Sequence, residues 1–155
     1  MAKKMALIAT KGTLDMAYPP FILGSTAAAL GWDVQIFFTF YGLQLLRKDL
    51  SDVKISPLGN PAMPMPIPMP VMVQMLPGME SMATMMMKQK MKSKGVASLE
   101  ELRDLCLEAD VKFVACQMTV DLFEFKKSDF IDNIEYGGAA TFMKFAGESD
   151  VCLFI

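Results

Sequence analysis

The sequence predicts an α/β fold in which a parallel, doubly wound sheet carries helices on both faces and so forms three layers. Apolar runs of strand length recur along the chain at residues 5–10, 32–40, 111–115 and 151–155. Segments with helical patterns separate these runs, and strands that alternate with helices are typical of a parallel sheet with right-handed crossovers. We therefore expect a single domain that spans residues 1–155.

The first helix is predicted over residues 17–30, after a turn at residues 11–15. Its body is small and apolar. Pro19 and Pro20 fit a first helical turn, because a missing N–H and a fixed φ do not disturb a helix there. Gly31 is expected to end this helix, since glycine readily adopts the conformation that follows a helix.

The middle of the chain is less regular. Residues 41–47 lead out of the second strand as a short helix or turn, and residues 53–58 fit a further strand. Residues 60–70 alternate methionine with proline, which excludes both a helix and the interior of a sheet. Residues 71–76 fit either a short strand or the start of a helix, and residues 80–94 fit a helix with a basic end.

Two further helices are predicted, one before the strand at residues 111–115 and one well after it. Ser98 and Glu101 have the spacing of a capping box at the start of the first one. The apolar side chains that follow share one helical face. They are Leu99, Leu102, Leu105, Cys106 and Ala109. The second helix is predicted over residues 139–146.

The composition excludes several classes of protein. A formal charge of −2 and a pI near 5.1 leave no basic surface for nucleic acid. Three cysteines without a paired spacing argue against a disulfide framework and fit a reducing cytoplasm. The lack of both a Cys-x-x-Cys pair and histidine argues against a structural zinc site, and the lack of histidine excludes a Cys–His catalytic pair. Lys11 ends the first apolar run too early for a secretory signal. We expect a cytoplasmic protein that needs no metal or cofactor.

Methionine and proline crowd the segment at about residues 60–79, which we interpret as an apolar insertion. The chain has 16 methionines, and no charged residue lies between 55 and 79. That length would cross a bilayer, but the prolines of this region exclude a regular spanning helix. They are Pro57, Pro61, Pro64, Pro66, Pro68, Pro70 and Pro77.

The insertion is expected to form an apolar contact surface. Subunit contact in a homo-oligomer is the first expectation, and peripheral membrane contact is the second. Cu(I) binding through thioethers is an alternative. The irregular spacing, and the lack of a cysteine or histidine in the tract, favour an adaptable contact surface.

Cys116 stands where the buried run at residues 111–115 meets a helix-compatible segment. A thiol there lies at the carboxyl end of a strand and the amino end of a helix, where open α/β sheets place ligands. Unpaired N–H groups and the helix dipole favour thiolate over thiol at such a position. A reactive thiol is therefore one interpretation of Cys116, and a small buried side chain is the other.

The other two cysteines have simpler interpretations. Cys106 lies on the apolar face of its helix, so core packing is favoured over a role as a relay thiol. Cys152 lies within the terminal apolar run and is expected to pack in the core.

Two glycine-containing loops are candidates for an anion pocket. Lys11 and Gly12 follow the first strand, and Gly137 and Gly138 precede the last helix. Such loops direct backbone N–H groups at anions, and loops after adjacent strands converge on one edge of a doubly wound sheet. Lys11 would then add positive charge beside Cys116. A turn glycine and a solvated lysine are the alternative, and no phosphate-binding motif is present.

Three segments resemble the DsrE/DsrF-like family, in particular its DsrE-like sulfurtransferase branch, which is sometimes labelled peroxiredoxin-related. They are KGTLDMA at 11–17, VKFVACQMTVD at 111–121 and IEYGGAATF at 134–142. The resemblance extends over nearly the whole chain. It implies a flavodoxin-like fold, assembly into homo-oligomers and a role in cytoplasmic sulfur trafficking.

The resemblance also implies a function for Cys116. In such proteins this cysteine holds sulfane sulfur as a persulfide, or thiosulfate as an S-thiosulfonate, and exchanges it with partners such as TusA-like carriers. Some members carry a second cysteine where Cys106 lies. We therefore expect a sulfur carrier or sulfurtransferase. The alternative is a non-catalytic oligomeric scaffold that docks on a membrane or a partner complex through its methionine-rich surface.

Overall fold

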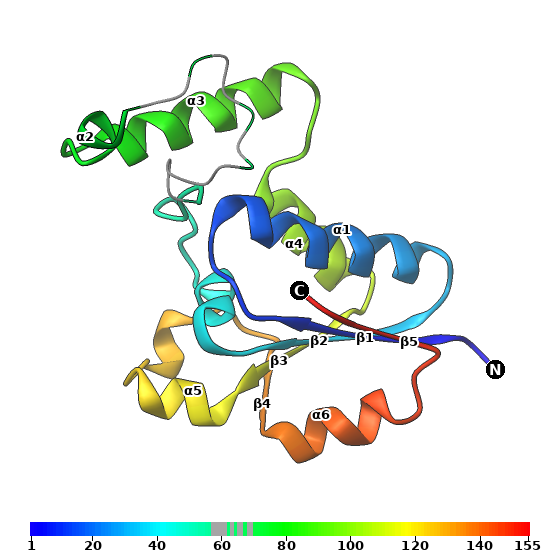
Figure 1. The fold of residues 1–155 in the computed structure, drawn as a ribbon. Helices are drawn as coiled ribbons and strands as arrows, with labels where there is room; N and C mark the ends of the chain where they lie inside the picture. Colours follow the sequence, from blue (N-terminus) through cyan, green and yellow to red (C-terminus); the bar gives the residue numbers. More distant parts are fainter. Residues whose placement is uncertain (57–61, 63, 65–66, 68–69) are drawn as a thin grey trace.

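The computed structural model describes residues 1–56, 62, 64, 67 and 70–155 (Figure 1). Within this part of the chain, a parallel sheet has the strand order β4-β3-β2-β1-β5. Its strands are β1 (Lys4–Ala9), β2 (Asp33–Phe38), β3 (Lys112–Cys116), β4 (Glu135–Gly137) and β5 (Val151–Phe154). The predicted α/β class is confirmed. The short strand β4 is an addition to the strands that the apolar runs predicted.

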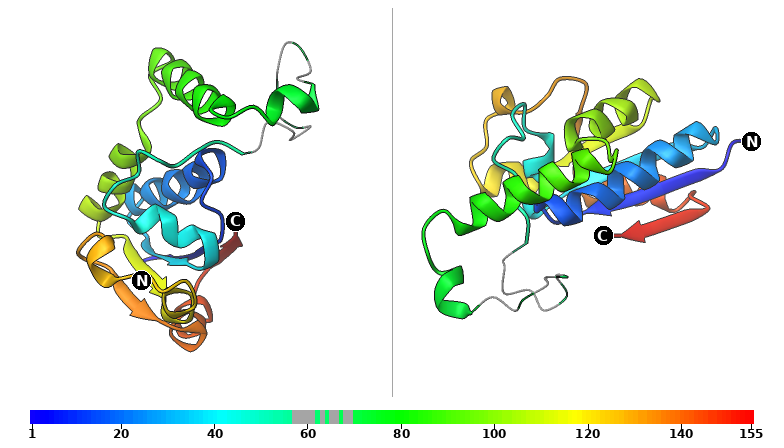
Figure 2. Two further views of the ribbon diagram at one scale, coloured as in Figure 1. Left: turned by 90° about the vertical axis from the view of Figure 1, so that its left-hand side faces the viewer. Right: turned by 90° about the horizontal axis from the view of Figure 1, so that it is seen from above.

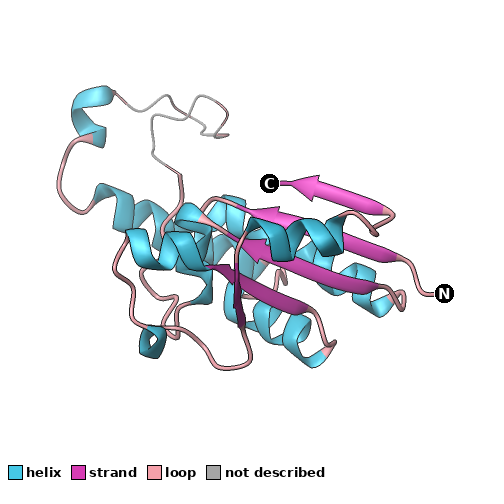
Figure 3. Ribbon diagram, turned by 90° about the horizontal axis from the view of Figure 1, so that it is seen from below, coloured by secondary structure: helices cyan, strands magenta, loops and turns pink. Residues whose placement is uncertain are grey.

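Helices cover both faces of this sheet (Figure 1). The helices α1 (Leu14–Ala29) and α4 (Leu99–Glu108) lie side by side on one face. On the other face, which Figure 3 views directly, lie α5 (Gln117–Leu122) and α6 (Ala139–Ala146). The three predicted layers are therefore present.

The remaining elements lie at the periphery. The helices α2 (Val71–Gln74) and α3 (Met79–Ser93) stand outside the layer of α1 and α4 (Figure 2). The 3₁₀ turn η1 (Phe40–Leu46) leaves β2 at its carboxyl end, as expected for residues 41–47, and η2 (Lys127–Asp129) precedes β4. The predicted helix at residues 80–94 corresponds to α3.

Alternating side chains of the strands build one core on each face of the sheet. Phe21 of α1 packs on Phe38 and Phe113 on one face, with ring centroids 5.9 and 5.8 Å apart. Phe37 stacks on Phe142 of α6 on the other, at 5.1 Å. The second core is smaller, and it also contains the side chain of Cys116.

The first helix begins three residues earlier than predicted. The amide of Leu14 donates to the carbonyl oxygen of Lys54 at 2.7 Å, which satisfies a first-turn N–H that has no partner within the helix. Pro19 and Pro20 consequently lie in the second turn, inside the helix. The helix ends as expected, with Gly31 at a φ of +80°.

The prediction of a strand at residues 53–58 is wrong for residues 53–56, which are the part of it that the structure describes. Residues 53–56 have no strand pairing, although Val53 and Ile55 are buried. The amide of Ile55 donates instead to the hydroxyl of Thr84 in α3 at 3.2 Å. Residues 57–58 and most of the methionine–proline alternation at 60–70 lie outside the described residues. Of the two alternatives for residues 71–76, the helix is the one present.

No helix in the described part of the chain has the length and apolar character needed to cross a bilayer. Large apolar side chains are nevertheless exposed along α2 and α3 and between them. They are Met72, Met75, Leu76, Met82, Met85 and Met86. Their exposure is consistent with the predicted contact surface, which stays a prediction.

Candidate functional site

Cys116 lies at the carboxyl edge of the sheet, where β3 ends and α5 begins. It is the N-cap residue of α5, as its position in the sequence predicts. In the sheet it pairs with Gly137 of β4 on one side. On the other side, the pairing of Ala115 with Phe38 places Thr39 next to Cys116. The residue is only 4 % exposed, so its sulfur is largely shielded from water.

Hydroxyl and amide groups surround the sulfur of Cys116. The side chains of Thr119 and Thr39 and the amides of Met118 and Thr119 are the polar groups near enough to lower the pKa of its thiol. The two threonine hydroxyls lie 3.2 Å apart, and Thr119 is fully buried. The amide of Phe40 donates to the Thr119 hydroxyl at 3.2 Å. The Thr119 hydroxyl accepts this hydrogen bond through a lone pair. Its own hydrogen is therefore not used in that contact and can be donated to Cys116 or to Thr39.

These contacts decide the protonation state of the thiol. Burial raises the pKa of Cys116, but hydrogen bonds from Thr119, Thr39 and the amide of Met118 outweigh it, so the pKa lies below the ordinary thiol value. The donors are those of a helix N-terminus together with two hydroxyls, and they favour the anionic form. Cys116 therefore has the environment of a nucleophile.

We expect the alkylation of Cys116 by iodoacetamide to have a midpoint below the free-thiol value of about 8.5. Thr119→Val should raise this midpoint, because the thiolate loses a hydrogen bond while the bulk of the side chain stays. A hydrogen bond to a charged group is worth at least about 1.5 kcal/mol, so the thiolate fraction below the midpoint should fall about tenfold.

The matched control for that experiment is Thr119→Ser, which keeps the hydroxyl and should keep the low midpoint. Labelling should be followed on the Cys116 peptide by mass spectrometry as a function of pH. A wild-type midpoint at or above the free-thiol value would show that desolvation dominates at this site.

The structure places Gly137 beside Cys116, and Gly138 follows it in the chain. Gly137 is its partner in the sheet, and Gly138 is the N-cap of α6. A side chain added at Gly138 would meet no atom within 4 Å. The loop between β4 and α6 is therefore open at the edge where Cys116 lies.

Lys11 and Gly12 are not next to Cys116. They follow β1, and β2 separates β1 from β3. Gly12 has a packing function instead, because a Cβ atom there would lie 2.5 Å from the carbonyl oxygen of Tyr41. Both residues border a cavity of about 400 Å³, together with Tyr41 and Gln44.

The other cysteines lie apart from Cys116. Cys106 is fully buried between α1 and α4, on the opposite face of the sheet, and its thiol donates to the carbonyl oxygen of Phe21 at 3.3 Å. Burial raises its pKa to about 12. Cys106 therefore has the environment of a packed core residue. The core position expected for Cys152 is wrong, because β5 is an edge strand and leaves this side chain exposed.

Sequence reasoning missed Thr39 and Thr119. The signal for Thr119 was present, because a residue three positions after an N-cap can interact with the capping side chain. Thr39 had no comparable signal. Its approach to Cys116 depends on the register between β2 and β3, which the sequence does not specify.

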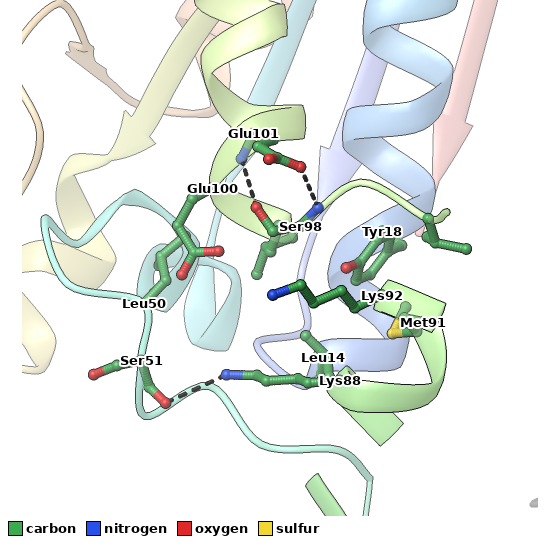
Figure 4. Close-up of a pocket in the computed structure, with 12 residues that line it drawn as sticks. Leu14, Tyr18, Leu50, Ser51, Lys88, Met91, Lys92, Ser98, Glu100 and Glu101 are labelled. Atoms are coloured by element: carbon green, nitrogen blue, oxygen red, sulfur yellow. Dashed lines mark hydrogen bonds between the residues drawn. The ribbon is translucent and has the colours of Figure 1, made fainter. Parts of the chain in front are cut away.

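A concave site lies on the face of the sheet opposite to Cys116 (Figure 4). It is a cavity of about 460 Å³ between α3, the start of α4 and the first turns of α1. Several of its polar groups bind one another: Ser98 and Glu101 close the capping box, and Lys88 donates to the carbonyl oxygen of Ser51 at 3.4 Å. No cysteine lines this cavity, so Cys116 remains the better candidate for covalent chemistry.

Comparisons with known proteins identify relatives over the whole chain. The model of the DsrE/DsrF/DrsH-like family matches residues 1–154. The chain is 68 % identical to the sulfur carrier protein DsrE2 of Allochromatium vinosum, over 99 % of this chain and 98 % of that protein. It is 33 % identical to the uncharacterized protein YrkE of Bacillus subtilis, over 99 % and 97 % of the two chains. The crystal structure of the YchN protein from E. coli has the same fold, with a TM-score of 0.54 over both full chains at 11 % identity.

Proposed function

Because the chain belongs to the DsrE/DsrF/DrsH-like family, we propose that it is a sulfur carrier that holds sulfur on Cys116 and passes it to a partner protein. The observation that carries the proposal is the environment of Cys116. Hydroxyl and amide donors lower the pKa of this thiol despite its burial. The similarity to a protein named a sulfur carrier supports the same conclusion.

Loading follows the chemistry of thiol–disulfide exchange. The Cys116 thiolate attacks the outer sulfur of a donor persulfide, R–S–SH, and forms a new S–S bond. The donor S–S bond breaks, and its electron pair leaves with R–S⁻. With tetrathionate as the donor, the thiolate attacks one of the two central sulfur atoms, the central S–S bond breaks, and the products are a Cys116 S-thiosulfonate and thiosulfate.

The adduct is anionic, as the thiolate is, so the same donors serve both states. A terminal persulfide sulfur carries its negative charge one bond beyond the cysteine sulfur, and the sulfonate oxygens carry theirs three bonds beyond it. The amides of Met118 and Thr119 and the open loop at Gly138 are the groups available to receive it. Neither step requires a cofactor or a metal.

The proposal also covers the acceptor protein, the compartment and the oligomeric state. We propose a TusA-like carrier as the acceptor, within the cytoplasm, and a homo-oligomer as the working form. The alternative function is a scaffold without covalent chemistry, and the exposed methionines along α2 and α3 favour it. A covalent adduct on Cys116 distinguishes the two, because a scaffold needs none.

The test is intact-protein mass spectrometry after incubation with polysulfide, and separately with tetrathionate. In a Cys152→Ser background, which removes the exposed thiol, we expect one adduct that maps to the Cys116 peptide and is removed by dithiothreitol. The loaded protein should then discharge its sulfur to a TusA-like carrier with a free cysteine. A protein that gains no mass on Cys116 from either donor would leave the scaffold as the better account.

A further inference from the structure

Five large apolar side chains are exposed at the edge of the sheet where Cys116 lies. They are Phe40, Tyr41, Met118, Leu122 and Phe123, which we call the apolar rim, and their exposure ranges from 40 % for Phe123 to 64 % for Tyr41. Such a group of exposed apolar side chains usually marks an interaction surface. Aromatic residues and methionine are also enriched in protein interfaces.

The three aromatic side chains of the apolar rim contact one another, and its two aliphatic side chains lie on the neighbouring helix. The rings of Tyr41 and Phe123 stack with centroids 6.1 Å apart, and Phe40 contacts both rings at 6.4 Å. Met118 and Leu122 are four residues apart on α5, so they lie on one face of that helix. The turn η1 and helix α5, which carry the rim, lie at the same end of the sheet (Figure 1).

The rim and the thiol share their supporting elements. Helix α5, which carries Met118 and Leu122, begins at Cys116. Phe40 has a φ of +48°, which a bulky residue rarely adopts, and in this conformation its amide reaches Thr119, which in turn contacts Cys116. A molecule that rests on the rim therefore contacts the helix that begins at Cys116 and the residue whose amide holds Thr119.

We infer that the apolar rim is the docking surface for the protein that exchanges sulfur with Cys116. This inference rests on the proposed function. The occupant is a protein that presents a cysteine thiol from a protruding, apolar segment. A protruding segment is needed because Cys116 is 96 % buried, and an apolar one is needed because no rim side chain carries a charge.

The reaction explains why the partner must dock so close. The acceptor thiolate attacks the outer sulfur of the Cys116 persulfide and forms its own S–S bond with it. The S–S bond to Cys116 breaks, and its electron pair returns to the Cys116 sulfur as thiolate. The attacking sulfur has to approach in line with the breaking bond, so the segment that carries it must rest on the surface around Cys116.

Another exposed apolar group, along α2 and α3, is a weaker candidate for this contact. Both helices stand outside the layer of α1 and α4, on the face of the sheet opposite to Cys116 (Figure 2). A partner seated there could not present a thiol to Cys116.

The test compares two disulfide probes that have the same leaving group. One is Ellman's reagent, and the other is a TusA-like carrier whose cysteine is converted to the mixed disulfide with thionitrobenzoate. In both, Cys116 thiolate forms a new disulfide and releases thionitrobenzoate, whose absorbance gives the second-order rate. A Cys152→Ser background removes the exposed thiol, which would also react.

Tyr41→Ala and Leu122→Ala should each slow the reaction with the carrier about fivefold, because they remove apolar contact area at the centre of the interface. Neither should change the rate with Ellman's reagent, which needs no docking. The matched control is Leu105→Ala, since Leu105 is an exposed leucine on α4, on the opposite face. It should change neither rate.

Two results would overturn the inference. In one, the rim variants react with the carrier at the wild-type rate, or lose the same factor with both probes. In the other, the wild type co-sediments with phosphatidylcholine liposomes and Tyr41→Ala does not, which would assign the rim to a membrane. The probes need no bound sulfur, so a failure of polysulfide to load Cys116 would count against the proposed function alone.

Discussion

Replacement of Cys116 by serine is expected to abolish sulfur loading completely. The sulfur atom is the attacking group, and a serine hydroxyl at neutral pH offers no comparable anion for attack on a persulfide. The variant should fold, because oxygen is smaller than sulfur and the neighbouring hydroxyls of Thr39 and Thr119 can bind it. Intact-protein mass spectrometry after exposure to polysulfide measures the loss.

The comparison is sharpest in a Cys152→Ser background. Cys152 is exposed and is the thiol that would take up sulfur non-specifically, whereas Cys106 is fully buried and donates to Phe21. Cys152→Ser alone should gain one adduct, and the double variant Cys116→Ser/Cys152→Ser should gain none. Equal labelling of the two proteins would assign the sulfur to Cys106 and exclude Cys116 as the carrier residue.

The position of Cys116 could be predicted because it depends on local pattern. An apolar run followed by a helix-compatible segment is enough to place a residue at the end of a buried strand. The helix α4 could be predicted for the same reason, and both hydrogen bonds of its capping box, between Ser98 and Glu101, are present.

The features that were missed depend on contacts between distant segments. The amide of Leu14 finds its acceptor at Lys54, which extends α1 beyond the start that Pro19 and Pro20 suggest. An apolar run does not reveal whether its strand is central, so the exposure of Cys152 on the edge strand β5 could not be predicted. Thr39 reaches Cys116 only through the pairing of β2 with β3.

The loops that support the site are packed so closely that a single methyl group should disrupt them. Gly42 rests on the end of β1: a Cβ atom there would lie 2.1 Å from the carbonyl oxygen of Ala9 and 2.8 Å from its carbon. The same carbonyl accepts the amide of Thr39 at 3.1 Å, and the carbonyl of Thr39 accepts the amide of Gly42 at 3.0 Å. A side chain at Gly42 needs this turn to move away from Ala9, and the hydrogen bonds that join Thr39 to Gly42 and to Ala9 carry that movement to Thr39.

Gly42→Ala should therefore destabilise the protein and also disturb the thiol. Overpacking costs about 1–3 kcal/mol where side chains can yield, and here the obstacle is backbone, so we expect about 3 kcal/mol. Displacement of Thr39 removes one of the hydroxyls that lower the pKa of Cys116, so the alkylation midpoint of the folded variant should rise. Urea unfolding gives the stability, and pH-dependent alkylation below the unfolding transition gives the midpoint.

The matched control is Gly138→Ala, since a Cβ atom at Gly138 meets no atom within 4 Å and its φ of −104° suits alanine. Equal urea midpoints for the two variants would show that the loop at Gly42 relaxes freely and does not hold Thr39 against Cys116.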